Sequence, residues 1–264
     1  MNRENNIYEY NRIADRKRVD FIASVLQNSL PENGKILDVG CGNGVISRHL
    51  GRLGYNVLGI DVSEKTIENA RKKSPMPNVQ FMTKSAEELV ASGEKYDAVI
   101  CSEVLEHLNE PGLLLKVLHD CLADNGKLII TVPNGNGPRE TLVTKPILSL
   151  RKKNNWLWRT ILKLKKMLGY SGTTVQSAAD NLDHIQFFSK DDLEKLSRRY
   201  GFRITGFGKS NFVEDVFPFS ILTNRIALLQ KLDCKIADVL PYHFTGGFFT
   251  VWEKSREGQF NGVR

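Results

Sequence analysis

Between Gly34 and Pro133 the sequence alternates short apolar runs with longer amphipathic runs. Short apolar runs of this kind indicate buried strands, and the longer runs, apolar at helical spacing, indicate helices. Because consecutive parallel strands need a helical crossover between them, the alternation is typical of an α/β domain with a mostly parallel sheet. It predicts helices on both faces of that sheet and ligands at the carboxyl ends of the strands.

These runs place the expected elements along the chain. Strands are expected at residues 35–39, 56–60, 79–83, 98–102 and 126–131, and later runs at 202–207 and 248–252 would complete a seven-stranded sheet. Helices are expected at residues 19–30, 45–53, 63–73, 86–91, 111–122 and 189–200.

A glycine-rich turn follows the first predicted strand. The stretch reads Asp38-Val39-Gly40-Cys41-Gly42-Asn43-Gly44. Glycine is required where the backbone takes conformations that a side chain would block, and where a ligand lies directly on the backbone. The turn also aims the N-terminus of the next helix at that ligand. We therefore expect a ligand site at the end of this strand.

Together with Asp38, the three glycines resemble the acid-x-Gly-x-Gly-x-Gly signature of class I S-adenosylmethionine-dependent methyltransferases. The dinucleotide fingerprint Gly-x-Gly-x-x-Gly would need glycine at Val45, so a nicotinamide oxidoreductase is disfavoured. The resemblance implies a Rossmann-like methyltransferase fold with a mostly parallel seven-stranded sheet and a helical insertion. It also implies S-adenosyl-L-methionine as the methyl donor.

The resemblance and the strand order assign donor contacts along the chain. Asp61 closes the second strand, where a carboxylate can accept hydrogen bonds from both ribose hydroxyls. Ser85 and Ala86 occupy the adenine-contacting position of the family, and Cys101 stands where the methionine moiety of the donor rests. The predicted donor-binding residues are Asp38, Gly40, Cys41, Gly42, Gly44, Asp61, Val62, Ser85, Ala86 and Cys101.

The fourth strand is followed by Glu103-Val104-Leu105-Glu106-His107-Leu108. If a helical turn begins at Glu103, then Glu103, Glu106 and His107 lie on one face. Two carboxylates and an imidazole are a candidate site for a hard divalent cation such as Mg²⁺. The segment is similar to the Glu-x-x-Glu-His metal motif of ubiquinone-biosynthesis O-methyltransferases and of small-RNA 2′-O-methyltransferases. Their further histidine has a candidate counterpart in His184.

Three roles stay open for this segment. In the first, Glu103, Glu106, His107 and His184 bind a cation that lowers the pKa of an acceptor hydroxyl and fixes its position. In the second, His107 or His184 acts as a general base without metal, with Glu106 beside it. In the third, the acid and the histidine only organise the turn after the strand, as in many methyltransferases of this broad family.

The positive charge of the chain is concentrated in one segment. Residues 139–170 carry nine Lys or Arg and one acid, whereas the whole chain has a net charge of +7. Leu157, Ile161, Leu164 and Leu168 form an apolar helical stripe there, with basic residues mostly on the opposite side. The pattern fits a lid helix, or peripheral contact of residues 151–168 with an anionic membrane or a lipid-linked acceptor. We do not expect nucleic acid as a partner, because no recognised RNA module accompanies the basic segment.

Cysteine usage and the first residues bear on the compartment. Cys41, Cys101, Cys121 and Cys234 are scattered without a Cys-x-x-Cys pair, which indicates buried thiols in a reducing compartment. Residues 1–20 are almost entirely polar, unlike a secretory signal. These features favour the cytoplasm, with membrane association as an addition through the basic segment.

These observations combine into one hypothesis. Residues 1–33 are expected to form cap helices, 34–134 the S-adenosylmethionine-binding core, 135–185 a basic helical insertion or lid, and 186–264 the rest of the sheet. The expected reaction is O-methylation of a hydroxyl on a small-molecule or lipid-linked acceptor, with Glu106, His107 and His184 as catalytic candidates. The alternatives are an RNA 2′-O-methyltransferase and a noncatalytic S-adenosylmethionine-binding module.

Overall fold

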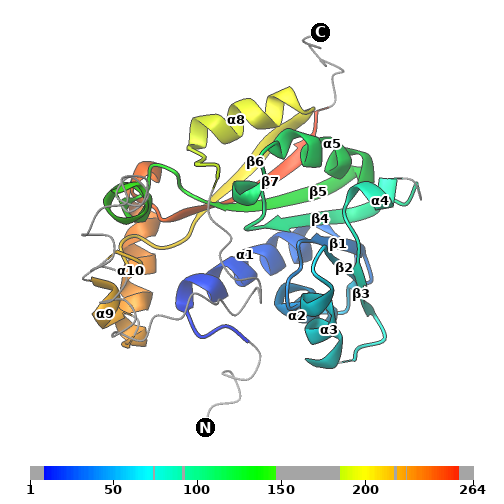
Figure 1. Ribbon diagram of the computed structural model, residues 1–264, viewed down its shortest axis with the longest axis horizontal. Helices are drawn as coiled ribbons and strands as arrows, with labels where there is room; N and C mark the ends of the chain where they lie inside the picture. The colour runs from blue at the N-terminus through cyan, green and yellow to red at the C-terminus, as the bar shows by residue number, and fades with distance from the viewer. Residues whose placement is uncertain are drawn as a thin grey trace.

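One seven-stranded sheet organises the protein, in the order β3-β2-β1-β4-β5-β7-β6 (Figure 1). The computed structural model describes residues 9–73, 75–90, 93–146, 185–216, 219–223 and 225–255. Strands β1 to β5 pair in parallel, and β7 is antiparallel to both β5 and β6. The predicted Rossmann-like α/β fold is confirmed.

The strands and helices follow the predicted alternation. The strands are β1 Lys35–Val39, β2 Asn56–Asp61, β3 Val79–Thr83, β4 Tyr96–Ser102, β5 Leu122–Pro133, β6 Phe202–Lys209 and β7 Gly247–Lys254. The α-helices are α1 Ile13–Ser29, α2 Val45–Arg52, α3 Glu64–Lys73, α4 Glu87–Val90, α5 Pro111–Cys121, α8 Lys190–Arg199, α9 Phe219–Thr223 and α10 Ala227–Val239. Two 3₁₀ turns, η2 Leu105–His107 and η4 Tyr242–Phe244, and one π-helical segment, η3 Glu140–Thr144, are also described.

Alternate residues of each strand pack on opposite faces of the sheet. In β1, Ile36 joins a core with residues of α1, α2 and α3, whereas Leu37 joins a core with residues of α5 and α8. Figure 1 shows the first three helices below the sheet and α5 and α8 above it. This two-sided covering is what a parallel sheet requires, because both of its faces are apolar.

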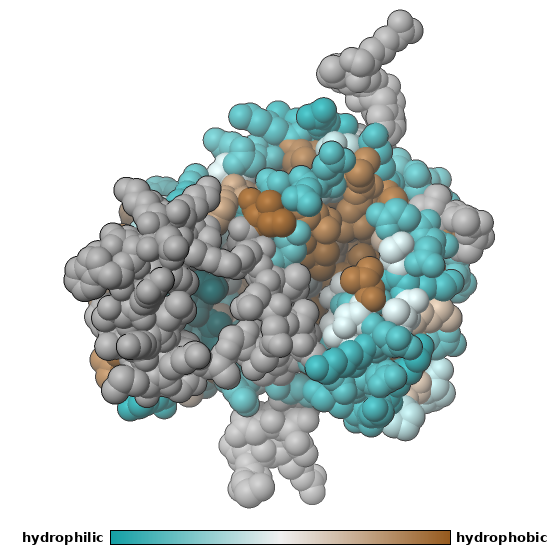
Figure 2. Space-filling model, in the orientation of Figure 1, coloured by the Kyte–Doolittle hydropathy of each residue, from teal (hydrophilic) through white to brown (hydrophobic). Residues whose placement is uncertain are grey.

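Strand order reverses between β1 and β4, which pair in parallel with Val39 opposite Cys101. The helices that follow these two strands run on opposite faces, so the loops after them diverge and leave a crevice at their carboxyl ends. On the face shown in Figure 2, hydrophobic residues gather in a hollow over β4 and β5, framed by hydrophilic ones. The glycine turn and the Glu103 segment therefore meet at the carboxyl ends of β1 and β4, in the middle of the sheet.

Several boundaries differ from the predicted ones. The helix expected at residues 19–30 begins earlier, since α1 spans Ile13–Ser29. The strand expected at residues 126–131 is longer, since β5 spans Leu122–Pro133 and pairs with both β4 and β7. Neighbouring strands stabilise flanking residues whose own sequence shows no strand pattern.

Two other predictions concern the thiols and the basic insertion. All four cysteines are free and buried, as expected. The predicted basic helix with Leu157, Ile161, Leu164 and Leu168 lies outside the described residues, as does His184. In the described part of the chain, no helix combines the length and the apolar character needed to cross a bilayer.

Candidate active site

The turn after β1 has a backbone that only glycine adopts without strain. Gly40, Gly42 and Gly44 have φ angles of 68°, 55° and 73°, all in the left-handed region. A Cβ on Gly40 would lie 2.5 Å from Cγ2 of Val104, and a Cβ on Gly44 would overlap the ring of Phe81. Both the angle and the lack of space therefore require glycine at Gly40 and Gly44.

Asp61 braces this turn from the end of β2. Its Oδ2 accepts a hydrogen bond from the amide of Gly42 at 3.0 Å, and its Oδ1 accepts one from the amide of Ser63 at 2.9 Å. An ionised carboxylate offers about four acceptor positions, so two remain after these bonds. Asp61 can thus hold the glycine turn and still accept hydrogen bonds from a ligand with two neighbouring hydroxyls.

Asp38 lies beneath the turn and is almost fully buried. Its Oδ2 accepts a hydrogen bond of 2.5 Å from the hydroxyl of Ser47 in α2. Burial raises the pKa of Asp38 to about 6, although the bond to Ser47 acts in the opposite direction. This hydrogen bond joins β1 to α2, the helix that follows the turn. Asp38 therefore helps to fix the shape of the turn.

The other predicted donor contacts differ in accessibility. Val62, directly after Asp61, is 76% exposed and offers an apolar surface beside the carboxylate. The amide of Ser85 donates a 2.7 Å hydrogen bond to Oε2 of Glu88, and Ala86 is buried. Cys101 is fully buried, which raises the pKa of its thiol. Among these predicted contacts, the side chain of Val62 is therefore accessible to a ligand, whereas the side chain of Cys101 packs in the core.

Glu103 begins the segment after β4 in an unexpected conformation. Its φ of 57° is left-handed, and the helical turn covers only Leu105–His107, in 3₁₀ form. A helical turn that starts at Glu103 is therefore wrong, so helical spacing no longer places Glu103, Glu106 and His107 on one face. The amide of Glu103 instead donates to the carbonyl of Thr131 in β5 at 2.9 Å, which pulls the chain toward the neighbouring strand.

The Glu103 carboxylate is held by two other elements. Its Oε1 lies 3.3 Å from Nη1 of Arg18 in α1 and accepts a 2.9 Å hydrogen bond from the hydroxyl of Thr131. Because Thr131 donates to this carboxylate, the hydroxyl of Ser102, 2.8 Å away, donates to Thr131. Arg18 also lies 3.2 Å from Asp15. The network ties α1 to the carboxyl ends of β4 and β5.

Glu106 is a buried acid without a hydrogen bond to its carboxylate oxygens among the described residues. Its Oε1 lies 3.7 Å from Nε2 of His107, too long for a hydrogen bond but close enough for an ion pair with a protonated imidazole. Burial, followed by the charge of Glu103, raises the pKa of Glu106 well above that of an ordinary glutamate. Glu106 therefore retains its proton at higher pH than a solvent-exposed glutamate does.

The predicted cation site is not assembled by these residues alone. In the part of the chain that the structure describes, no three His, Cys, Asp or Glu side chains gather closely enough to hold a metal ion. Glu103 is already engaged by Arg18 and Thr131. The fourth predicted ligand, His184, lies outside the described residues.

A cavity of about 90 Å³ opens beside Glu103. Its lining includes Arg12 directly before α1, Arg18 within α1, Asn211 and Asp215 from the segment after β6, and Arg139. Arg12 joins α1 to that segment, with ion pairs of 3.0 Å to Glu214 and 2.7 Å to Asp215. The cavity lies at the carboxyl ends of the parallel strands, beside Glu103 after β4 and Pro133 of β5.

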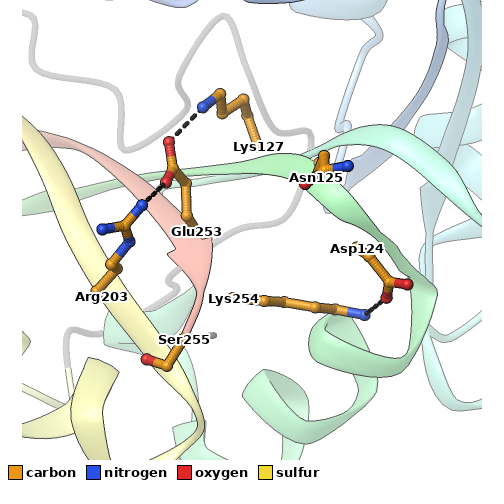
Figure 3. Close-up of a pocket in the computed structure, with 8 residues that line it drawn as sticks. Asp124, Asn125, Lys127, Arg203, Glu253, Lys254 and Ser255 are labelled. Atoms are coloured by element: carbon orange, nitrogen blue, oxygen red, sulfur yellow. Dashed lines mark hydrogen bonds and ion pairs between the residues drawn. The ribbon is translucent and has the colours of Figure 1, made fainter. Parts of the chain in front are cut away.

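A larger cleft of about 430 Å³ lies at the opposite ends of the strands, where β5 begins and β7 ends (Figure 3). Its charged residues pair with one another: Glu253 contacts Lys127 and Arg203, and Lys254 lies 3.5 Å from Asp124. These pairs fasten β6 and β7 to β5. The cleft shares no residue with the glycine turn, so it is separate from the candidate site.

Sequence reasoning missed Arg18, Thr131 and Asn211, which line or order the site from α1, β5 and the segment after β6. Each lies far along the chain from the Glu103 segment. Arg18 precedes the run predicted as a helix at 19–30, so the sequence pattern gave no signal for it, whereas the structure places it within α1 and almost fully buried. A buried arginine requires acidic partners, which here are Glu103 and Asp15.

The sequence is similar to a methyltransferase family and to two ubiquinone biosynthesis enzymes. A family profile described as "Methyltransferase domain" matches residues 10–206. The human mitochondrial ubiquinone biosynthesis O-methyltransferase is 32% identical over 185 residues, which cover 62% of this chain and 50% of that protein. The ubiquinone biosynthesis O-methyltransferase of Xanthomonas axonopodis pv. citri is 33% identical over 120 residues, covering 44% of this chain and 49% of that protein. The chain thus spans about half the length of these relatives.

Solved structures share the fold at lower identity. Magnesium protoporphyrin IX methyltransferase of Synechocystis, crystallised with bound S-adenosylhomocysteine, has a TM-score of 0.53 at 20% identity and covers 92% of this chain and 84% of its own. A SAM-dependent methyltransferase of Methanosarcina mazei has a TM-score of 0.54 at 19% identity, with coverage of 88% and 98%. At these identities the likeness concerns the fold alone.

Proposed function

This chain belongs to the methyltransferase domain family, and we propose that it transfers the methyl group of S-adenosyl-L-methionine to a hydroxyl oxygen of a small or lipid-linked acceptor. The observation that carries the proposal is the glycine turn at the switch point of the sheet, braced by Asp61. The relatives that are named as ubiquinone biosynthesis O-methyltransferases support oxygen as the acceptor atom.

The proposed donor site uses the glycine turn, Asp61 and Val62. Asp61 would accept hydrogen bonds from the ribose hydroxyls through its two remaining acceptor positions. The exposed side chain of Val62 would cover one face of the adenine. Ser85 and Ala86 stay proposed neighbours of the base, and Cys101, at the end of β4, stays the proposed neighbour of the methionine moiety.

In the proposed reaction, the acceptor oxygen attacks the methyl carbon while the bond from carbon to sulfur breaks and S-adenosylhomocysteine leaves. The sulfonium already makes the methyl group electrophilic, so the protein mainly has to align the acceptor and remove its proton. His107 is the proposed base, and Glu106, whose Oε1 lies 3.7 Å from Nε2 of His107, would help to position the imidazole. The cavity of about 90 Å³ beside Glu103 would hold only the reacting end of the acceptor.

The divalent cation predicted from Glu103, Glu106, His107 and His184 stays a separate proposal. No step above depends on it, because the described residues do not bring three of these ligands together. Dialysis against a chelator and subsequent addition of Mg²⁺ would show whether turnover or acceptor affinity requires the ion.

The test begins with binding and then asks for transfer. Calorimetry should show S-adenosylhomocysteine binding that Asp61→Ala weakens and that nicotinamide nucleotides do not replace. Ubiquinone carries methoxy groups on a prenylated ring, so a prenylated phenol with a free hydroxyl and labelled S-adenosylmethionine should yield a methyl ether. His107→Ala should lower kcat while S-adenosylhomocysteine binding persists. Donor binding without transfer to any hydroxyl acceptor would indicate a binding module, and label on single-stranded RNA would indicate the RNA alternative.

A further inference from the structure

Helix α10 buries two polar residues and exposes four large apolar ones. Its buried residues are Gln230, Asp233, Cys234 and Ala237. Leu228, Leu232, Ile236 and Val239 are all exposed, with Leu228 at 73% and Val239 at 83%. Their spacing of four, four and three residues forms one stripe along the helix. A helix with this orientation exposes the surface that would ordinarily be buried.

Hydrogen bonds fix this orientation. Asp233 accepts bonds of 2.7 Å and 2.9 Å from the amides of Phe212 and Val213. Gln230 accepts a 3.0 Å bond from the amide of Ile13 in α1 and donates a 2.9 Å bond to the carbonyl of Thr223. Turning the helix to bury its leucines would leave these polar groups without partners, at a cost of about 1–3 kcal/mol each.

Helix α9 extends the apolar surface. Phe219 and Leu222 are exposed on it, and α9 packs against α10 at one edge of the molecule (Figure 1). We call the combined surface the α9–α10 face. It comprises Phe219, Leu222, Leu228, Leu232, Ile236 and Val239. Contiguous exposed apolar surface of this kind marks an interaction site more often than scattered single residues do.

The charges around the α9–α10 face are predominantly positive. Arg225, Lys231 and Lys235 are exposed beside the apolar stripe. Of the acids in α10, Asp233 is buried, and Asp238 forms an ion pair of 2.6 Å with Lys17. Among the described residues, the exposed charged side chains beside the stripe are thus mainly basic, whereas the two acids of α10 are either buried or paired with a lysine.

We propose that the α9–α10 face docks on an anionic phospholipid bilayer. The apolar side chains would enter the boundary between headgroups and acyl chains, and the lysines would extend to the phosphates. A second copy of the chain is a poorer occupant, because a twofold contact through this stripe would bring Lys231 and Lys235 close to the same residues of the partner. A surface of phosphate groups avoids that repulsion.

The position of the face connects it with the candidate acceptor cavity. Asp233 of α10 holds the segment that begins at Ser210, and Ser210, Asn211 and Asp215 of that segment line the cavity. A bilayer on the α9–α10 face would therefore lie on the opposite side of α10 from the segment that lines the cavity, with this one helix between them. This inference deepens the proposed function by favouring a lipid-linked acceptor, but docking itself can be measured without turnover.

Vesicle cosedimentation with the full chain tests the proposal. The probes are vesicles of phosphatidylcholine alone and of phosphatidylcholine mixed with phosphatidylglycerol. The protein should bind the mixed vesicles, and Leu228→Gln, Leu232→Gln and Val239→Gln combined should lower the partition coefficient about tenfold or more. Lys231→Gln with Lys235→Gln should reduce the preference for the anionic vesicles.

A matched pair of single variants controls for loss of an exposed leucine. Leu232→Gln should weaken vesicle binding, whereas Leu113→Gln on α5 should not, although the two leucines are 53% and 55% exposed. These single changes also keep the test informative if the triple variant fails to fold. All variants should bind S-adenosylhomocysteine like the parent, which separates failed docking from a failed donor site.

Three results would overturn the proposal. One is a parent protein that binds neither kind of vesicle. Another is equal loss of binding in Leu113→Gln and Leu232→Gln. The third is a dimer in light scattering that the triple variant dissociates while vesicle binding is unchanged, since the face would then be covered by a second copy.

Discussion

Gly40→Ala tests whether the turn after β1 is set by backbone conformation and space together. The φ of 68° at Gly40 costs an alanine about 1–2 kcal/mol. Its Cβ would also lie 2.5 Å from Cγ2 of Val104, and overpacking of this kind costs about 1–3 kcal/mol. The free energy of unfolding should therefore fall by about 2–5 kcal/mol.

Gly54 offers a matched control for the backbone contribution. Its φ is 96°, and a Cβ there would meet no heavy atom within 4 Å. Gly54→Ala should therefore cost only the backbone strain, about 1–2 kcal/mol. Val104→Ala isolates the steric contribution, because the next nearest Val104 atoms would lie 3.7 Å from a Cβ on Gly40, an ordinary contact. Gly40→Ala made in that background should cost about as much as Gly54→Ala.

Urea denaturation measures the stability differences, and calorimetry with S-adenosylhomocysteine measures the consequence for the donor site. Gly40→Ala should weaken binding by about tenfold or more, which corresponds to about 1.4 kcal/mol. Gly54→Ala should leave it unchanged. The reasoning is refuted if Gly40→Ala costs no more stability than Gly54→Ala, or if Val104→Ala fails to reduce the cost of Gly40→Ala.

Three further predictions concern acids and their partners. Asp61→Ala leaves the amides of Gly42 and Ser63 without their acceptor and should weaken S-adenosylhomocysteine binding about tenfold to a hundredfold by calorimetry, with Asp61→Asn less affected. The folded protein holds the proton of Glu106 more tightly than the unfolded chain, so this residue lowers the free energy of unfolding as pH rises above the ordinary glutamate pKa. The free energy of unfolding of Glu106→Gln, relative to that of the parent, should therefore be larger at about pH 8 than at about pH 5. An equal difference at both pH values would contradict the assignment. Arg18→Met leaves Glu103 without its cation and should cost about 3 kcal/mol in urea denaturation, part of which Glu103→Gln should restore.

Local pattern was sufficient for the donor half of the protein. The alternation between Gly34 and Pro133 predicts the parallel strands, because strand and helix periodicities are properties of adjacent residues. The same holds for the glycine turn and for Asp61, whose positions follow from the ends of consecutive strands. The membership in the methyltransferase domain family was accordingly predictable from the signature of Asp38 to Gly44.

The reacting end depended on contacts that no local pattern contains. A helical reading of the Glu103 segment was wrong because Glu103 takes a left-handed conformation, with its amide bonded to Thr131 of the neighbouring strand and its carboxylate to Arg18 of α1. These partners meet only after the sheet and α1 have assembled.

Helix α10 shows the same division between sequence and tertiary structure. Periodicity alone identifies the stripe from Leu228 to Val239 and would bury it, since apolar faces ordinarily pack inward. Asp233 and Gln230 instead face the protein, because amides of the segment after β6 and of α1 need acceptors there. The spacing of Leu228, Leu232, Ile236 and Val239 is a property of the sequence, whereas only the surrounding backbone, which supplies partners for Gln230 and Asp233, decided that this stripe points outward.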